Sequence, residues 1–364
     1  MLKWFISSKR ISEGWLCPTE KLLVKVGLYN LLFIFFIGLL GLVIPFTLNF
    51  IIDFKEYISY SIPVSIGLLM VSNLLYGFKH YGDLIYEVAN VLGSIGGEKI
   101  KKEILTAVYS NKRFISAVVF AFFVSSVILL FIKINIFFYI LYVIGGLLIG
   151  FLGGDAILGT IMYPLVVGKK FYQLREQKYE ILYHIDQLKI IAVTGLSLMV
   201  NGVVLLILII AGIHYVFVFL FTKINYSVAF LLEIIALIIA TPSLLLLFYY
   251  PLYSIKRTAD LEKKAILNAL SNKEREIISN LKKLVFNLKD SEDEWDKIDN
   301  ETVTSYVTVL NAIHALKEYY KSLSPWPVTL GTVAKSIVLS FIPWLSSISE
   351  IQTLMNSILT FLLH

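Results

Sequence analysis

Hydrophobic residues in this chain form long runs with few polar interruptions, unlike the regular spacing of a half-buried helix or strand. A run of about 18 or more apolar residues is long enough to cross a bilayer as a helix. The runs predict six transmembrane helices, at about residues 23–52, 57–78, 115–133, 136–167, 191–222 and 226–253. The gaps between them at 53–56, 134–135 and 223–225 are very short, so we expect three helical hairpins.

Composition assigns the chain to the same class. Of its 364 residues, 57% are hydrophobic and only 16% are charged, whereas about a quarter of the residues in soluble proteins are charged. Pattern and composition together predict an all-α, polytopic helical membrane protein, with the lipid bilayer as its first partner. The formal net charge of +6 does not indicate nucleic acid as a partner, because the basic residues cluster beside the apolar runs.

The distribution of Lys and Arg predicts the orientation in the membrane. Basic residues gather in the N-terminal segment, in 79–114 and in 168–190, whereas the opposite side holds only Lys55, Lys133 and Lys223. Cytoplasmic loops carry the excess of Lys and Arg, so we expect a multi-pass protein of the cell membrane with both termini in the cytoplasm. Residues 1–22 then form a cytoplasmic segment, and 23–254 form the six-helix transmembrane domain.

Two of the expected hairpins are similar in sequence. "FIKIN" (131–135) recurs as "FTKIN" (221–225), and "MYPL" (162–165) recurs as "YYPL" (249–252). Both copies run in the same direction, which predicts a parallel internal repeat and not the inverted repeat of many secondary transporters.

The repeated helices are longer than a bilayer requires. From Lys133 to Lys169 the chain has 36 residues, or roughly 54 Å of helix, against a hydrocarbon core of about 30 Å. Either the helices protrude into the cytoplasm or they break. The repeat aligns Gly153-Gly154-Asp155 with Thr241-Pro242-Ser243, so we expect a helix break or hinge at Gly153, Gly154, Asp155 and Pro242.

Polar residues inside the apolar runs are candidates for a functional site, because burying them in a membrane requires a partner or water. Glu233 lies about eight residues past the outer turn, or roughly 12 Å deep, and Asn201 and His214 lie on the facing helix. We treat these three residues as a candidate intramembrane polar site; a plain hydrogen bond from Glu233 to Asn201 or His214 is the alternative. Asp155 lies roughly 30 Å from the outer turn, at the inner membrane boundary, where the alternative role is a helix N-cap.

Gly146, Gly150 and Gly154 are spaced four residues apart on one helix face. Small residues at this spacing allow helix backbones to approach closely. We expect them to serve helix packing; lining a pore is the alternative.

Residues after the last expected span change in character. In 255–325, dense charge with apolar residues at helical spacing predicts a cytoplasmic helical hairpin, which could bind a cytoplasmic protein partner. Residues 326–364 are amphipathic and predict a segment in the membrane interface or at an oligomer contact; a short seventh and eighth span is the alternative. The whole chain is expected to form a homo-oligomer.

No catalytic motif is present in the sequence. The five histidines lack the spacing of metal ligands, and "GSIGGEK" (93–99) lacks the spacing and the Ser or Thr of a phosphate-binding loop, so we expect a helix break there. We therefore predict no catalytic residue, no metal and no cofactor. Cys17 is the only cysteine, so no intrachain disulfide can form.

The C-terminal third resembles a group of uncharacterised prokaryotic polytopic membrane proteins. In that group a span ending in Pro-Leu is followed by a helix with regular Lys and Leu, then by a charged hairpin that leads to Trp-Pro. The matching residues are Pro251-Leu252, Lys264, Leu267, Trp326-Pro327 and Pro343. The chain departs from the group at Lys256 and at Val328-Thr329, where the group has His and an aromatic–acid pair. The resemblance implies architecture and no known activity.

Two classes of function fit these features. The intramembrane polar residues favour an oligomeric channel or transporter. The overlong helices and the charged hairpin fit a membrane scaffold, and the "YPL" units followed by basic helices are similar to platform proteins of archaeal pilus and type II secretion systems. A membrane enzyme is the third possibility and has no residue-level support.

Overall fold

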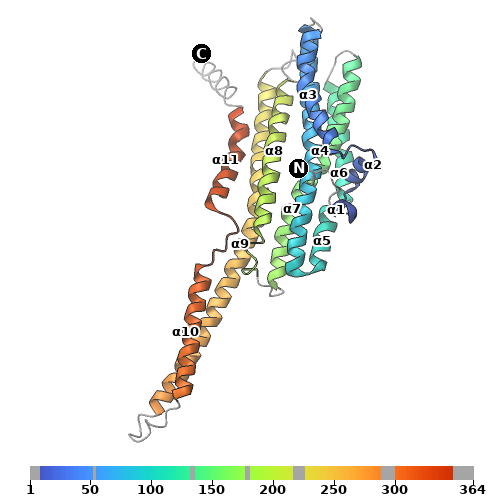
Figure 1. Ribbon diagram of the computed structural model, residues 1–364. Coiled ribbons are helices and arrows are strands. Elements are labelled where there is room, and N and C mark those ends of the chain that lie inside the picture. The colour runs from blue at the N-terminus through green and yellow to red at the C-terminus, as the bar shows by residue number, and fades with distance from the viewer. Residues whose placement is uncertain are drawn as a thin grey trace, which may run out of the picture.

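The computed structural model describes residues 9–51, 55–131, 136–176, 181–215, 226–287 and 300–346, and all elements in these ranges are helices (Figure 1). They are α1 (Lys9–Ser12), α2 (Pro18–Lys25), α3 (Leu31–Ile51), α4 (Lys55–Gly96), α5 (Glu98–Val108), α6 (Lys112–Phe131), α7 (Ile136–Glu176), α8 (Lys189–Tyr215), α9 (Tyr226–Asn287), α10 (Asn300–Ser322) and α11 (Leu330–Ser346). The "KIN" turn residues of the expected repeat and the end of the chain after 346 lie outside the described residues.

Five helical segments are long and apolar enough to cross a membrane, so the chain is a membrane-embedded, all-α protein. They are Ile62–Gly96, Glu98–Ser126, Tyr139–Leu174, Lys189–Ile213 and Leu231–Leu284. A sixth apolar stretch, Leu31–Val43 in α3, is shorter. The six spans, the repeat and the orientation therefore remain predictions.

The helix boundaries differ from those expected at two places. The expected first span begins at 23, but Gly27 has a φ of 79° and ends α2, and α3 begins only at Leu31. The region 79–114, expected to be a loop, is helical: α4 continues to Gly96, and α5 follows directly. Gly97 has a φ of 86° and separates the two helices, so the prediction of a plain helix break in "GSIGGEK" is correct.

Among the described residues, the bundle has four inner helices (α4, α7, α8 and α9) and four outer ones (α3, α5, α6 and α11). Among the inner helices, α4 packs against α7 and α8, and α9 packs against α7 and α8. The outer helix α3 packs on α4, α6 packs on α7, and α11 packs on α8 and α9 (Figure 1). Consecutive long helices thus lie together as the pairs α3–α4, α6–α7 and α8–α9.

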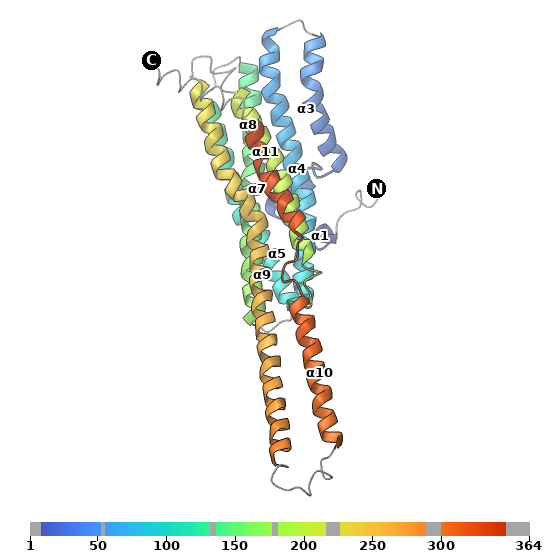
Figure 2. The ribbon, with the colours of Figure 1, turned by 90° about the vertical axis from the view of Figure 1, so that its left-hand side faces the viewer.

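The helix α9 leaves the bundle and pairs with α10 to form a stalk (Figure 2). Because α9 is a single helix of 62 residues, no helix end separates the expected transmembrane domain from the expected charged hairpin. Lys317 and His314 of α10 both contact Glu274 of α9. Near the base of the stalk, Lys263 Nζ donates hydrogen bonds to the carbonyl groups of Lys321 and Leu323, each at 2.7 Å.

The helices run without interruption through the positions at which breaks were expected. The helix α7 passes through Gly153, Gly154 and Asp155, and α9 passes through Pro242. The prediction of a helix break is therefore wrong at both places, whereas a hinge there stays a prediction. Of the two explanations for the overlong helices, the structure contradicts a break, and protrusion from the membrane stays a prediction.

Close packing of α6 on α7 depends on two glycines of the four-residue series. A Cβ atom at Gly150 would lie 2.7 Å from Ala121 Cα, and one at Gly154 would lie 2.7 Å from the Ser116 carbonyl oxygen. Ser116 Oγ also donates a hydrogen bond to the Gly154 carbonyl at 3.0 Å. The backbones of α6 and α7 can approach this closely only because neither glycine has a side chain.

Neighbouring glycines in α7 offer a direct test of this packing. Gly154→Ala should lower the free energy of unfolding by about 1–3 kcal/mol, because its methyl group overlaps the α6 backbone. Gly153→Ala should raise it by about 0.5–1 kcal/mol, since no atom lies within 4 Å of the added carbon and alanine favours a helix. Unfolding of the two variants in detergent measures both values; effects of the same sign would contradict the packing described here.

Candidate functional site

The N-terminal segment is attached to the bundle through the buried side chain of Arg10. Its Nη1 donates to both carboxylate oxygens of Glu20, at 2.8 and 3.0 Å, and its Nε donates to Asp83 Oδ1 at 3.1 Å. Its Nη2 donates to Tyr29 Oη at 2.7 Å. The guanidinium also lies against the Tyr109 ring, in space left by Gly82, where a Cβ would lie 2.4 Å from Arg10 Cζ.

A capping box at the start of α2 holds Glu20 in place. The Cys17 backbone N–H donates to Glu20 Oε2 at 3.0 Å, and the Glu20 backbone N–H donates to Cys17 Sγ at 3.4 Å. Pro18 occupies the first turn of α2, where a missing N–H costs nothing. The local sequence Cys17-Pro18-Thr19-Glu20 therefore fixes both the helix start and the carboxylate that binds Arg10.

A second buried ion pair joins α6 to α7. Arg113 Nε donates to Asp155 Oδ1, and Arg113 Nη1 donates to the Val108 carbonyl at 3.3 Å. The Asp155 side chain is completely buried. The N-cap role considered for it is wrong, because Asp155 lies in the middle of α7 and not at a helix start. The Cys17 thiol donates to Asp155 Oδ2 at 3.2 Å. Cys17 thus links the two ion pairs into one network, which we call the ionic cluster (Arg10, Cys17, Glu20, Arg113 and Asp155).

Burial and neighbouring charges hold the protons on Arg10 and Cys17 of the cluster and on the adjacent Tyr29. Burial alone would lower the pKa of Arg10, but Glu20, Tyr109, Tyr29 and Asp83 together outweigh it and the net shift is upward. Burial raises the pKa of the Cys17 thiol, and Glu20 raises it further. The pKa of the Tyr29 hydroxyl rises for the same two reasons. All three groups therefore keep their protons at neutral pH.

A cavity of about 420 Å³ lies beside the ionic cluster, between the four inner helices. We call it the central cavity. Glu20, Tyr109 and Arg113 line its charged end. Its walls are mainly apolar, with polar side chains from Thr160 on α7, Asn201 on α8 and Ser243 on α9. Four glycines of the inner helices are also among its lining residues: Gly77, Gly82, Gly159 and Gly202.

The central cavity reaches the outer surface between α7 and α9. Ile157 and Ile161 of α7 and Ile239 of α9 all line the cavity, and yet 46%, 48% and 65% of their respective surfaces are exposed. Further along, the gap is closed at Gly168, where a Cβ would lie 2.4 Å from Tyr250 Cε1. Since exposed apolar side chains of a membrane helix face lipid, this opening is a lateral portal toward the bilayer.

The central cavity has few polar groups apart from its charged end. Ser243 Oγ donates to the Ile239 carbonyl at 2.8 Å, and no His, Lys or Cys is among the described residues that line the cavity. Within the part of the chain that the structure describes, no group of three or more His, Cys, Asp or Glu side chains could hold a metal ion. Apolar walls with a charged end fit an amphipathic ligand.

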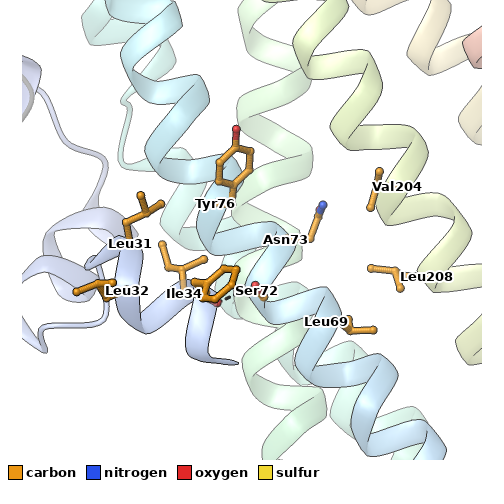
Figure 3. A pocket seen from close by; sticks show the side chains of 10 residues that line it. Leu31, Leu32, Ile34, Leu69, Ser72, Asn73, Tyr76, Val204 and Leu208 are labelled. Atoms are coloured by element: carbon orange, nitrogen blue, oxygen red, sulfur yellow. Dashed lines mark hydrogen bonds between the residues drawn. The ribbon is translucent and has the colours of Figure 1, made fainter. Parts of the chain in front are cut away.

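A second hollow lies on the other side of the α4–α8 contact, next to α3 (Figure 3). It has a volume of about 540 Å³, and Figure 3 shows Asn73 between α4 and the Val204 and Leu208 side chains of α8. Asn73 Oδ1 is buried without a hydrogen-bond partner among the described residues. We call this hollow the outer groove; it lacks the charged end of the central cavity.

The predicted intramembrane polar residues fall at different places. Asn201 lines the central cavity and faces α4, since a Cβ on Gly77 would lie 3.0 Å from its Nδ2. Glu233 is buried, with 2% of its surface exposed, and is not among the described residues that line the cavity. His214 lies in α8, but its side chain is outside the described residues. The predicted grouping of the three stays a prediction.

Most of the ionic cluster was not predicted from the sequence. Arg10 and Arg113 counted only among the basic residues that predict the orientation, and Glu20 was not among the candidate residues. Two signals could have found them: the cap sequence beginning at Cys17, and the requirement that a buried Asp155 have a cationic partner. Comparison with known protein families, curated proteins and solved structures found no match to this chain.

Proposed function

We propose that this membrane protein is a transporter of a small amphipathic molecule and that the central cavity is its substrate site. The observation that carries the proposal is the combination of a charged end with a lateral portal in one cavity. A substrate with an apolar body can enter between α7 and α9 from the bilayer. Its polar end then lies near Arg113, whose Nη2 makes no hydrogen bond among the described residues.

A channel in an oligomer, with a path along Glu233, is the other form of the transport proposal. It receives less support, because the residues of the central cavity do not include Glu233 and one end of the cavity is closed by the ionic cluster.

Entry of an anionic dye into vesicles tests the transporter proposal. The probe is 1-anilinonaphthalene-8-sulfonate, which is amphipathic and fluoresces when it binds serum albumin trapped inside the vesicle. Vesicles with the wild-type protein should take up the dye faster than protein-free vesicles. Ala240→Trp, which fills the cavity, should reduce the added rate by at least about tenfold, since the site would be occupied.

The matched control is at Ile238, two residues before Ala240 in α9. Ile238→Trp places the same side chain on the lipid-facing side of α9, where 56% of the isoleucine surface is exposed, and should leave the rate unchanged. Equal rates in the two variants would contradict transport through the central cavity.

A scaffold function is the second candidate, and the stalk favours it. The stalk carries exposed apolar side chains on both helices, among them Ile278, Val307, Leu316 and Tyr319. Singly exposed apolar residues are ordinary, but a helical projection of this kind suits docking of a cytoplasmic protein. Failure of the dye experiment would leave this function as the better supported one.

A further inference from the structure

A basic groove lies between α5 and α7, separate from the central cavity. It has a volume of about 630 Å³ and is lined by Lys99 and Lys102 of α5 and by Lys169 and Lys170 of α7, together with Glu103, Gln173 and three small or apolar residues. We call it the lysine groove. Four lysines against one glutamate give it a formal charge of +3.

Lys170 forms the contacts that join the two sides of the groove. Lys170 Nζ donates to Glu103 Oε2 and to Gln173 Oε1, the latter at 2.6 Å, and the residue is buried. This ion pair joins α5 to α7 within the groove.

Three further lysines remain available for a ligand. Lys99, Lys102 and Lys169 are exposed and make no ion pair or hydrogen bond among the described residues. Ammonium groups that face one hollow from two helices repel each other, and a multivalent oxyanion relieves that repulsion. The groove therefore matches a phosphate group.

An exposed apolar stripe leads to the same place. Ile157, Ile161 and Leu165 follow one another at intervals of four residues along α7, with 46%, 48% and 45% of their surfaces exposed. The next position in this series is Lys169. The stripe from Ile157 to Lys169 is about 18 Å long, which is comparable with an acyl chain.

We propose that the lysine groove binds the phosphate headgroup of an anionic glycerophospholipid, whose acyl chain lies along the stripe. A soluble phosphate compound would share the headgroup chemistry but would make no use of the stripe. Basic pockets between membrane helices near the cytoplasmic surface are typical sites for anionic headgroups. The lipid is therefore the ligand that accounts for both features.

Native mass spectrometry of the full chain in a neutral detergent tests this proposal. The protein is incubated with equal amounts of dioleoyl phosphatidylglycerol and dioleoyl phosphatidylcholine. We expect bound phosphatidylglycerol to exceed phosphatidylcholine by about tenfold or more. The double variant Lys102→Gln/Lys169→Gln should lose most of that preference, because it removes two of the three uncommitted ammonium groups, one from each helix, and keeps the Lys170–Glu103 pair.

Two control variants test whether the lysine groove itself is the binding site. Lys282→Gln/Lys283→Gln removes the same charge from exposed positions on the stalk and should keep the preference; an equal loss would overturn the proposal. Thr106→Asp, at an exposed position that lines the groove, should abolish the preference with every lysine in place. If it does not, the groove is not the site.

Competition with a soluble phosphate compound tests whether the bound phosphate group belongs to a lipid. An excess of glycerol 3-phosphate should leave phosphatidylglycerol bound, because the soluble compound lacks the acyl chain. Displacement of the lipid by glycerol 3-phosphate would overturn the lipid assignment and identify a soluble ligand. Ile157 and Ile161 belong both to the portal and to the stripe. The dye experiment nevertheless tests Ala240 in the central cavity and the lipid experiment tests the lysine groove, so each can fail without the other.

Discussion

Asp155→Ala is expected to lower the free energy of unfolding by about 3–5 kcal/mol, because it leaves the buried Arg113 guanidinium without its counter-ion. The Asp155 side chain is fully buried and that of Arg113 is 7% exposed, so water cannot replace the lost carboxylate. The Cys17 thiol loses its acceptor at the same time. Denaturant unfolding of the purified variant in detergent measures the change.

An exposed ion pair supplies the control for this variant. Asp186 pairs with Lys189 at 2.8 Å, but 83% of its side chain is exposed, so Asp186→Ala should change stability by less than about 0.5 kcal/mol. The double variant Arg113→Met/Asp155→Leu should recover most of the loss, because it removes both buried charges and keeps apolar volume. A double variant as unstable as Asp155→Ala would show that the charges are not the cause.

Arg10→Ala is expected to release the N-terminal segment from the bundle. It leaves the Glu20 carboxylate buried, with only 1% of its surface exposed, and without its cation. The cost of such an unpaired charge is about 3 kcal/mol or more, which corresponds to roughly a hundredfold higher population of the detached state. Alkylation of Cys17 by iodoacetamide measures this population, because Cys17 is the only cysteine and is completely buried.

The raised pKa of Cys17 predicts how the rate of its alkylation depends on pH. A free thiol ionises near pH 8.5 and reacts as the thiolate, whereas burial keeps the folded-state thiol protonated above that pH. Wild-type alkylation should therefore stay slow at pH 9, and Arg10→Ala should react about a hundredfold faster. Lys21→Ala, which removes an exposed charge from the same helix, should behave as the wild type. Rapid wild-type alkylation would contradict the structure.

Hydrophobic runs were sufficient to predict the membrane class, because a helix that crosses a bilayer needs a continuous apolar length. They could not locate helix ends beyond the membrane. The lower part of α4 and the whole of α5 carry many charged residues, and their helical structure is stabilised by burial of residues such as Leu92, Ile104 and Leu105, which a search for apolar runs does not detect.

The partner of Asp155 was predictable in principle. Arg113 lies 21 residues before position 134, in the expected turn, and Asp155 lies 21 residues after it. Residues equally distant from the turn of an antiparallel helical hairpin lie side by side, so the symmetry alone pairs them. The link to Arg10 and Glu20 was not predictable in this way, because it depends on how a short segment before the first long helix folds back onto the bundle.

Because α9 is continuous, its part in the stalk moves together with its part in the bundle. No proline follows Pro251 in this helix, and from Ser254 to Asn287 it extends for about 50 Å. A tilt of about 5° at the closed end of the portal, near Gly168 and Tyr250, would move the tip of the stalk by about 4 Å. Opening or closing of the portal between α7 and α9 would thus be transmitted mechanically, without any further hinge, to whatever binds the far end of the stalk.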